Sequence, residues 1–594
     1  MLILFFLSLM FLLLLFNFVI DYMLNNYKLP KKYNEIKIDY KINHTGEINR
    51  DGFSKKKIPV NIDSIIIGSG ISGLTTAGLL SRVGKKVLVL EQHYVSGGAT
   101  HCFEDKGWEF DTGIHYIGNI KSRDKVLNLI MDKKVEWIPL GHDNDLIYDN
   151  IIINENKYSF KPGKENLVNY LSLLFPKEKD NIKKYIELVQ RVAKMELFFI
   201  LKIIKPFWLV KILYYLFCSE FRYYSGKSEY EILSEYFKDE RLKYVLSGLS
   251  IDGGPPPSEQ SFFIHAGILN HFIEGGYYPK GGPSVFAKNI IPTIEKSGGR
   301  VLVKAPVDKI IIHNDKAVGV CVKGINIYAK QIISSVGIKN TYLKLLKEYE
   351  IYNTYFNNII ENVPSDLSYN FLFVGLDGNA KDLGLNSSNI YTWNETSFDN
   401  AVKEYYKDPF NNIPPIFIAS SSAKDTEWIN KYPNKSTVCV ISWSNVKLFN
   451  TQNIPRKRKD NKYKEDKEKI EKILWNALYK YFPKCKDKVL FSSTSTSETV
   501  KYYLGSYNGE CYGLDAVTKR FSYLKLRPET NVENLYLTGQ DITASGFGSA
   551  ITSGVLTVSN ILGYNLYDMI IGRNIINDIK NINKTNQLKN KKKI

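Results

Sequence analysis

Three glycines and one acid in the first hundred residues have the types and spacing of a dinucleotide site. Gly68, Gly70 and Gly73 form a G-x-G-x-x-G loop. The first glycine allows a tight turn, the second lets a pyrophosphate approach the backbone, and the third lets a helix pack against a strand. Glu91 follows at the distance where a carboxylate accepts hydrogen bonds from an adenosine ribose. These residues predict binding of an adenine dinucleotide, but they do not separate FAD from NAD.

A βαβ unit is needed to hold these residues, and the flanking sequence predicts one. Residues 65–67 are an apolar run typical of a strand buried on both faces. Residues 74–80 repeat apolar side chains at helical spacing, and Gly84 is suited to cap that helix. Residues 86–90 supply the second strand, which ends at the acid. The complete unit makes the motif more specific than its glycines alone.

A second segment, residues 534–554, distinguishes the two cofactors. It predicts a strand ending at Thr538 and Gly539, then Asp541, then a glycine-spaced entry into an apolar helix. In flavoproteins of the glutathione-reductase type such a segment closes over the middle of FAD, with the acid on the ribityl chain and the helix start facing the pyrophosphate. Alone, the segment could be an ordinary strand-to-helix turn. Joined to the first motif, it favours FAD as the tightly held cofactor, with NAD or NADP possible as the reductant.

The formal net charge of +18 in 594 residues raises the question of a nucleic-acid partner. Residues 21–57, 455–469 and 573–594 carry 14 of this excess, and the rest of the chain is nearly balanced. Because the charge lies in a linker, an insertion and a tail, we expect no nucleic-acid binding. The six cysteines show no C-x-x-C or His–Cys spacing, so neither a metal site nor a disulfide framework is predicted.

The two ends of the chain predict a membrane location. Residues 1–20 contain no charge and are long enough to cross a hydrocarbon core of ~30 Å. They lack the basic start and cleavage site of a signal peptide, so we favour an uncleaved anchor. Lysines follow this segment but do not precede it, which places the body in the cytosol. Residues 591–594, KKKI, resemble a dilysine retrieval signal and so predict the endoplasmic-reticulum membrane.

Several stretches resemble the carotenoid and retinoid oxidoreductases, and most closely the all-trans-retinol 13,14-reductases, also called retinol saturases. They are VLVLEQH (87–93), EFDTGIHYIG (109–118), EGGYYPKGG (274–282), NTYLKLL (340–346), CYG (511–513) and NLYLTGQD (534–541). The resemblance implies a flavin enzyme that reduces one double bond of an apolar polyene such as a retinoid or carotenoid. The wider family includes phytoene desaturases and carotenoid isomerases, so fold and cofactor transfer more safely than reaction direction.

The resemblance also implies an α/β fold. It combines a Rossmann-like FAD/NAD(P)-binding domain of the glutathione-reductase type with a discontinuous α+β substrate domain and an N-terminal membrane helix. The expected divisions are a membrane anchor or signal peptide (1–24), a basic linker (25–57), the FAD-binding domain (58–135, 270–345 and 500–570), the substrate domain (136–269 and 346–499) and a basic tail (571–594).

The motifs and the resemblance together define the expected site. The backbone of Val307 should touch adenine, and the glycines that follow residue 96 should lie against the flavin. The expected cofactor-binding residues are Gly68, Gly70, Ser72, Gly73, Glu91, Gln92, Gly97, Gly98, Asp111, Val307, Gly539 and Asp541. The candidate catalytic acids, taken from flavin-adjacent family motifs, are His115, Tyr116, Tyr278 and Tyr512. For each of these four, a packed side chain bonded to backbone is the structural alternative.

The implied reaction sets requirements of its own. An isolated polyene double bond has no carbonyl to accept charge, so direct hydride attack would be slow. Protonation of one carbon first would leave a delocalised cation, which reduced flavin could then reduce. The enzyme would need a dry apolar tunnel and an acid near the isoalloxazine. The alternatives are a desaturase, an isomerase, an amine-oxidase-like enzyme, or a prenyl-binding protein of the Rab escort and GDP-dissociation-inhibitor type without redox chemistry.

Two further segments have no place in these motifs. Residues 195–217 are apolar but carry Lys202, Lys205 and Lys211, which favours an interfacial amphipathic segment that contacts membrane lipid and admits substrate. A buried core helix is the alternative. Residues 456–469 are strongly charged, and we interpret them as a solvated loop. The oligomeric state does not follow from any pattern.

Overall fold

The computed structural model describes residues 46–449 and 461–571, together with positions 8, 10, 11 and 14. Most of the predicted anchor, the linker up to residue 45 and the basic tail beyond residue 571 lie outside the described residues. Among the residues that are described, no helix has the length and apolar character needed to cross a membrane.

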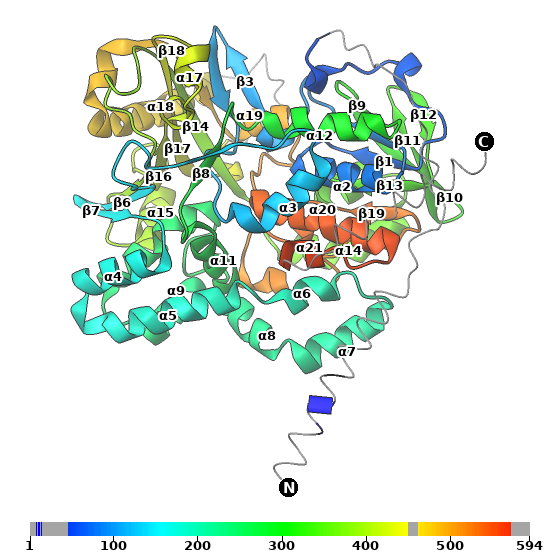
Figure 1. Cartoon of the computed structure of the whole chain (residues 1–594), viewed down its shortest axis with the longest axis horizontal. Coiled ribbons are helices and arrows are strands. Elements are labelled where there is room, and N and C mark those ends of the chain that lie inside the picture. Colours follow the sequence, from blue (N-terminus) through cyan, green and yellow to red (C-terminus); the bar gives the residue numbers. More distant parts are fainter. Residues whose placement is uncertain (1–7, 9, 12–13, 15–45, 450–460, 572–594) are drawn as a thin grey trace.

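A five-stranded parallel sheet forms one half of the molecule (Figure 1). Its strands come from three distant parts of the chain and are buried on both faces, as their apolar runs predict. Their spatial order is β19 (Leu535–Leu537), β13 (Gln331–Ser334), β1 (Ser64–Ile67), β2 (Val87–Leu90) and β9 (Arg300–Leu302). Helices α2 (Ile71–Arg82), α12 (Val285–Lys296) and α20 (Phe547–Leu562) pack together beside this sheet.

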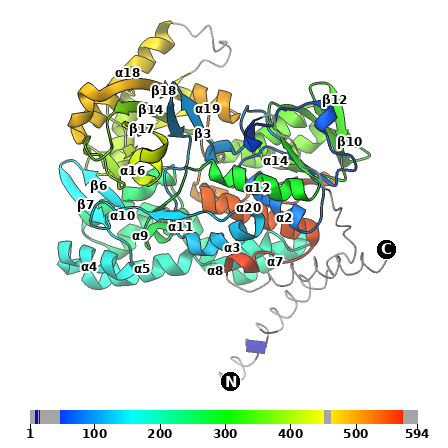
Figure 2. The same cartoon turned by 45° about the horizontal axis from the view of Figure 1, so that its top comes forward.

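A smaller antiparallel sheet lies at one end of the molecule, far from the seven-stranded sheet described next (Figures 1 and 2). It consists of β10 (Val307–His313), β11 (Lys316–Val322) and β12 (Ile325–Tyr328). The first residue of β10 also reaches the main cavity.

A seven-stranded mixed sheet forms the other half. The strand order is β18 (Val489–Ser495), β14 (Leu367–Asp377), β17 (Lys435–Asn445), β16 (Ile416–Ala419), β15 (Asn389–Trp393), β6 (Asp149–Ile153) and β7 (Asn156–Phe160). Along β14, Leu372 and Val374 pack in one core cluster, while Phe371 and Phe373 belong to the other and line the main cavity. The alternation of strand side chains therefore separates a structural face from a site-forming face.

The charged insertion differs from its prediction. Residues 461–469 are the start of helix α18 (Asn461–Tyr481) rather than a solvated loop, and residues 450–460 lie outside the described residues. Ile470, Leu474 and Leu478 are buried against the structural face of β14 and β17. The charged residues therefore form the first turns of a helix that is held in place by the apolar residues after them.

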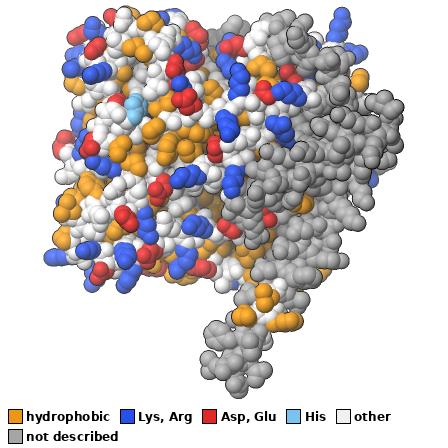
Figure 3. Space-filling view, viewed as in Figure 1, with side chains coloured by type: hydrophobic (Ala, Val, Ile, Leu, Met, Phe, Trp, Pro, Cys, Tyr) orange, Lys and Arg blue, Asp and Glu red, His pale blue; other side chains and the backbone are white. Residues whose placement is uncertain are grey.

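Residues 164–272 form a group of α-helices, most of which lie along the lower edge of the molecule in Figure 1. They are α4 (Lys164–Leu174), α5 (Lys179–Val192), α6 (Glu196–Leu201), α7 (Phe207–Phe217), α8 (Ser219–Gly226), α9 (Glu229–Tyr236), α10 (Glu240–Leu246) and α11 (Phe262–Phe272). On the face shown in Figure 3, basic and acidic side chains are interspersed rather than gathered into one basic field.

Residues 195–217 are two helices of different character, not one amphipathic segment. In α6, Phe198 and Leu201 are buried, and the Lys202 that follows is buried as well. The Lys202 ammonium donates to the carbonyl of Leu526 at 2.7 Å, so it does not reach toward solvent. Only α7 exposes a row of large apolar side chains. The core alternative is correct for α6, and an interfacial role is left to α7 alone.

Candidate active site

The glycine loop joins β1 to α2 as the motif predicts. Gly68 has φ +95°, a conformation that favours glycine. A Cβ on Gly73 would lie 2.3 Å from the carbonyl oxygen of Gly68, so only glycine allows the helix to approach the strand this closely. A Cβ on Gly70 would instead meet open space, and Gly70 lines the main cavity. The loop therefore presents bare backbone to a ligand at the start of α2.

Glu91 closes this loop onto the end of β2. Its carboxylate accepts from the backbone N–H and hydroxyl of Ser69 at 2.9 and 2.7 Å, and from the N–H of His93 at 2.9 Å. Glu91 and Gln92 both line the cavity. The acid thus orders the loop, and its bond to a ribose stays a prediction.

The second motif contacts the first directly, beside the cavity. The Ser72 hydroxyl lies 2.6 Å from the hydroxyl of Thr538, 466 residues away, and 2.7 Å from that of Ser553. The Asp541 carboxylate accepts from the backbone N–H groups of Ile338 and Leu514 at 2.8 and 2.9 Å. These contacts hold three chain segments around one space, with the start of α20 open to it.

The cavity has a volume of about 1830 Å³, well above the ~300–1,000 Å³ of ordinary small-molecule sites. The space suits a dinucleotide and a second long ligand together. The expected cofactor residues in its wall are Gly68, Gly70, Ser72, Glu91, Gln92, Gly98, Val307, Gly539 and Asp541. Bare glycine backbone, two helix starts and a carboxylate in one wall fit the phosphate and polyol groups of FAD.

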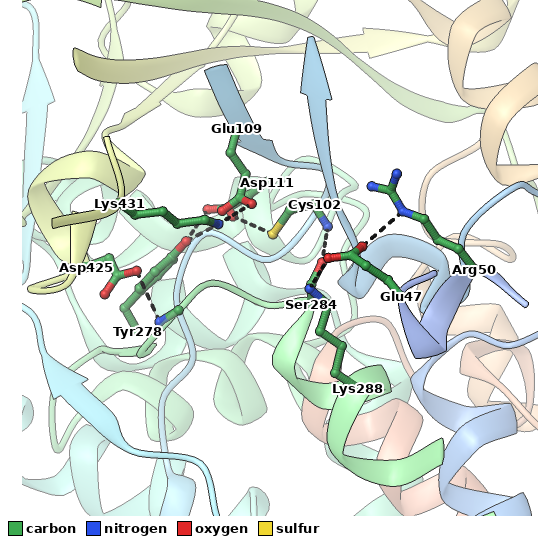
Figure 4. A network of polar contacts seen from close by, with 11 residues as sticks. Glu47, Arg50, Cys102, Glu109, Asp111, Tyr278, Ser284, Lys288, Asp425 and Lys431 are labelled. Atoms are coloured by element: carbon green, nitrogen blue, oxygen red, sulfur yellow. Dashed lines mark hydrogen bonds and ion pairs between the residues drawn. The ribbon is translucent and has the colours of Figure 1, made fainter. Parts of the chain in front are cut away.

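Three of the expected cofactor residues do not line the cavity. Gly73 and Gly97 serve the packing of the loops behind it, where Gly97 has φ +124° and donates its N–H to the Ser69 hydroxyl at 3.0 Å. Asp111 lies at the end of β4 (Trp108–Asp111), which pairs with β3 (Cys102–Asp105). Its carboxylate accepts from the Tyr278 hydroxyl at 2.9 Å (Figure 4). It also accepts from the Ser421 hydroxyl at 2.5 Å.

Tyr278, a candidate acid, is committed to the same contact. It lies in β8 (Tyr277–Pro279), is buried, and does not line the cavity. Burial raises the pKa of Asp111 to about 6 and holds the pKa of Tyr278 well above its usual value. The pair joins β4 to β8. Neither residue belongs to the cavity wall, so neither has direct access to a ligand there.

His115 lines the cavity but is unsuited to act as an acid. Burial, assisted by the nearby Lys424 charge, lowers its pKa to about 3. Neither ring nitrogen has a hydrogen-bond partner within the described part of the chain. His115 is therefore a neutral imidazole at neutral pH, available to a bound ligand only as a hydrogen-bonding or packing group.

Tyr512 also lines the cavity, beside the second motif. Its ring meets that of Tyr369 edge-on, with centroids 5.6 Å apart. The next residue, Gly513, has φ +65°, and a Cβ there would lie 2.2 Å from an Asp541 carboxylate oxygen. Burial raises the pKa of Tyr512 above its usual value, so its hydroxyl is a poor proton donor.

Tyr116 belongs to a polar cluster that sequence reasoning missed. Its hydroxyl lies 2.5 Å from that of Tyr391 and 3.1 Å from the Asp149 carboxylate. Tyr391 donates to Asp252 at 2.9 Å, and Asp252 lines the cavity. Burial raises the pKa of Asp149 and of Asp252 to about 7. The only local signal was Asp252 before the turn sequence Gly-Gly-Pro-Pro-Pro, since the other members lie far apart in sequence.

An apolar arm makes up a further part of the cavity wall, which also extends to α6 and α21 (Asp568–Ile571). Aromatic and aliphatic side chains from α11 and from the site-forming face of the large sheet supply most of this arm. They include Phe263, Ile264, Ile268, Phe371, Phe417 and Ile441. Such a wall accepts a long apolar ligand and excludes water.

Comparison with known proteins relates most of the chain to flavoenzymes. A family described as flavin containing amine oxidoreductase matches residues 71–562. An all-trans-retinol 13,14-reductase of Danio rerio is 35% identical over 549 residues, covering 88% of this chain and 89% of that protein. The Homo sapiens protein of the same name is 32% identical and covers 92% of this chain and 91% of its own length.

Among solved structures, the cyclohexylamine oxidase of Brevibacterium oxydans superposes with a TM-score of 0.53 at 16% identity. The match covers 85% of this chain and 99% of the oxidase. At this identity the likeness concerns the fold, which is a mixed α/β amine-oxidase-like architecture.

Proposed function

The chain belongs to the flavin containing amine oxidoreductase family and, within it, groups with the all-trans-retinol 13,14-reductases; from this premise we propose a function. The protein is an FAD-dependent oxidoreductase that reduces a carbon–carbon double bond of a retinoid. The observation that carries this conclusion is one cavity that joins both nucleotide motifs to an aromatic-walled apolar arm. A flavin and a polyene can therefore lie in contact.

The residues of the cavity wall divide the work between cofactor and substrate. Gly70 and the start of α20 line the cavity and would offer backbone N–H groups to the pyrophosphate, while Asp541 would face the ribityl chain. When bound, FAD supplies hydride chemistry. The apolar arm holds the polyene and keeps water away from it. The glutathione-reductase type of domain and the division between cofactor and substrate domains belong to this proposal.

An anaerobic turnover experiment tests the proposal. Protein whose flavin has been reduced is incubated with a panel of retinoids and carotenoids, and the products are analysed by mass and retention. A gain of two hydrogens is expected for a retinoid. An unchanged mass with altered retention would instead identify an isomerase, and a loss of two hydrogens with the oxidised protein would identify a desaturase. A purified protein without a flavin spectrum would favour a prenyl-binding role.

We also propose that the protein is anchored in the endoplasmic-reticulum membrane with its body in the cytosol. The uncharged residues 1–20, the lysines that follow them and the terminal KKKI support this location, and all lie in segments that the structure leaves largely undescribed. In intact microsomes, added protease should digest the body. Protection of the body from protease would contradict the proposed orientation.

Helix α7 is the proposed second contact with membrane lipid. Trp208, Ile212, Tyr215 and Leu216 are 62%, 47%, 66% and 66% exposed. They lie beside α6, which the cavity reaches, so a polyene could pass from lipid to the site without crossing water. A chain lacking residues 1–24 should still bind liposomes, and Trp208→Asp with Leu216→Asp should release it.

A control pair uses exposed apolar residues on the opposite side of the molecule. Ile429 in α17 (Trp428–Lys431) and Leu490 in β18 are 56% and 64% exposed. Both of these elements lie far from α7 in Figure 1. Ile429→Asp with Leu490→Asp should leave liposome binding unchanged. Equal binding of the α7 variant and this control would place the lipid contact elsewhere.

A further inference from the structure

Four side-chain oxygens form a row beside the cavity, whose wall includes both Tyr116 and Asp252. Asp149 Oδ2 lies 3.1 Å from Tyr116 Oη, which lies 2.5 Å from Tyr391 Oη. Tyr391 Oη lies 2.9 Å from Asp252 Oδ2. Asp149 and Tyr391 are fully buried, in β6 and β15, which pair in parallel. Asp252 lines the cavity and keeps part of its surface accessible.

This row needs more protons than its two tyrosine hydroxyls supply. Three oxygen–oxygen contacts each need one proton, and the two hydroxyls provide only two. Because unfilled contacts between buried oxygens are costly, the third proton belongs to one of the carboxyl groups. It can reside on Asp149 or on Asp252, and either choice fills all three contacts. A proton can therefore pass along the row without any heavy atom changing place.

The two ends of the row have different surroundings. The Asn389 side-chain N–H₂ donates to Asp149 Oδ1 at 2.7 Å, and the Lys424 ammonium donates to the Asn389 carbonyl oxygen at 2.5 Å. These groups stabilise Asp149 as a carboxylate. Asp252 accepts from Tyr391 and, at 3.4 Å, from Tyr116, and both of these bonds fall on Oδ2. This arrangement favours a proton at the cavity end.

Asp252 lies close enough to Tyr512, in a motif expected near the flavin, for burial and the Asp252 charge together to raise the pKa of that tyrosine. A Cβ on Gly254 would lie 3.4 Å from the Tyr512 ring, and Tyr512 precedes the glycine that touches Asp541. The Tyr369 hydroxyl donates to the carbonyl of Ile251 at 2.5 Å, which fixes the same loop. The titratable groups facing Asp252 are Tyr116, Tyr369, Tyr391, Tyr512 and Asp149.

We propose that Asp252 is the acid that protonates the polyene carbon, and that Tyr391 and Tyr116 link it to Asp149, the other carboxyl group on which the shared proton can reside. This assignment rests on the proposed function. The O–H bond of Asp252 breaks and its electron pair stays on the carboxylate, while the π electrons of the double bond form the new C–H bond. Hydride from the reduced cofactor completes the second C–H bond, and a reduced pyridine nucleotide is the class of donor that restores the cofactor.

The direct test is Asp252→Asn, which keeps the shape and removes the acid. Product formation should fall by ~10²- to 10⁴-fold, the range for a lost general acid. FAD content and retinoid binding, read from absorbance and fluorescence quenching, should not change. Asp515→Asn is the matched control, because Asp515 is buried with a pKa raised by burial to about 6 but lies outside the cavity wall. It should retain wild-type turnover.

Infrared difference spectra provide a readout that does not depend on turnover. Between acidic and alkaline samples, the wild type should lose the C=O band of a protonated carboxyl near pH 7, and this band should be missing or altered in Asp252→Asn. Tyr391→Phe removes a donor that stabilises the Asp252 carboxylate, so both the band and the alkaline limb of the rate should move to higher pH. A residue with a purely structural role would not shift the pH profile.

Each outcome decides the assignment. Loss of a general acid should lower turnover by at least ~10²-fold. Turnover by Asp252→Asn within about twofold of wild type would therefore overturn the assignment. If that variant fails to hold FAD, the pH shift of Tyr391→Phe decides, and an unshifted profile overturns the proposal. If the wild type reduces no retinoid, the proposed function fails, whereas the infrared titration still tests where the proton resides. Absence of any carboxyl band that depends on Asp252 would also reject it.

Discussion

The nucleotide cradle and the buried oxygen row differ in how the chain builds them. The cradle around Gly68, Gly70 and Glu91 comes from one βαβ unit of the chain, and its hydrogen bonds are largely made to backbone. The row from Asp149 to Asp252 joins four segments through side chains alone. The cofactor site is therefore sensitive to backbone space, whereas the acid site is sensitive to the loss of single oxygen atoms.

The chemistry of the two ligands explains this difference. A dinucleotide presents the same phosphates in every protein that binds it, so one local backbone pattern serves. A polyene offers no polar handle at the double bond, so protonation requires an acid held in a dry wall. Such a wall forms only where a sheet, a loop and a helix meet. Predictions about the two regions should consequently fail in different ways.

The largest expected effect is on the cradle. Gly70→Val should abolish FAD retention, because the side chain would enter the open space reserved for the pyrophosphate. The flavin absorbance of the desalted protein measures this. Gly226→Val is the control, since a Cβ at Gly226 also meets open space but lies outside the cavity wall. Stoichiometric FAD in Gly70→Val would contradict the cofactor assignment.

The next effect is on the far end of the oxygen row. Asp149→Asn keeps an acceptor for Tyr116 but removes the other carboxyl group that can take the shared proton, so the rate should fall about tenfold or more, less than the ~10²–10⁴-fold cost of a lost acid. FAD content should stay at the wild-type level. Single-turnover reduction of a retinoid measures the effect. A larger loss than that of Asp252→Asn would reverse the roles assigned to the two carboxyls.

A smaller effect concerns stability against pH. The pKa of Asp149 and of Asp252 is about 7 when folded, above the ~3.9 of an unfolded aspartate. The folded state therefore binds more protons between these values, and this contribution to stability is lost as pH rises through 7. Asp149→Asn should accordingly lose less Tm than wild type between pH 5 and pH 8, values chosen to span the folded pKa. Equal losses would show that Asp149 does not titrate in this range.

The smallest effect is expected at the border between the two regions. Tyr512→Phe should change turnover by less than about threefold, below the ~10²-fold minimum for a lost acid, because burial makes this hydroxyl a poor donor. Steady-state rates with FAD-saturated protein measure it. A loss comparable to that of Asp252→Asn would move the acid from the oxygen row to the flavin-adjacent motif.

Local patterns in the sequence were enough to predict the cofactor site. The strand, the glycine loop and the helix after Gly73 form from neighbouring residues whose types leave few alternatives. The segment after Thr538 was identified in the same way. The mixed α/β fold and the FAD cofactor, both implied by these motifs and by the family resemblance, are confirmed. The exact domain bounds stay predictions.

Contacts between distant segments decided the rest. Charge alone suggested a loop at residues 456–469, but the apolar stripe that follows packs on the large sheet and makes residues 461–469 helical. Lys202 looked interfacial, yet the packing of α6 buries it. Asp111 and Tyr278 belong to family motifs near the flavin, but their mutual hydrogen bond keeps them outside the cavity wall.

Asp252 shows most clearly what the sequence could not reveal. Its role depends on Tyr391, 139 residues later, and on Asp149, which only sheet pairing brings near. Its pKa depends on burial, which no local pattern records. The sequence by itself determined the backbone cradle, because that site needs only residue types at fixed spacing. The tertiary structure decided the acid, because a proton donor is defined by the partners and the solvent that the fold places around it.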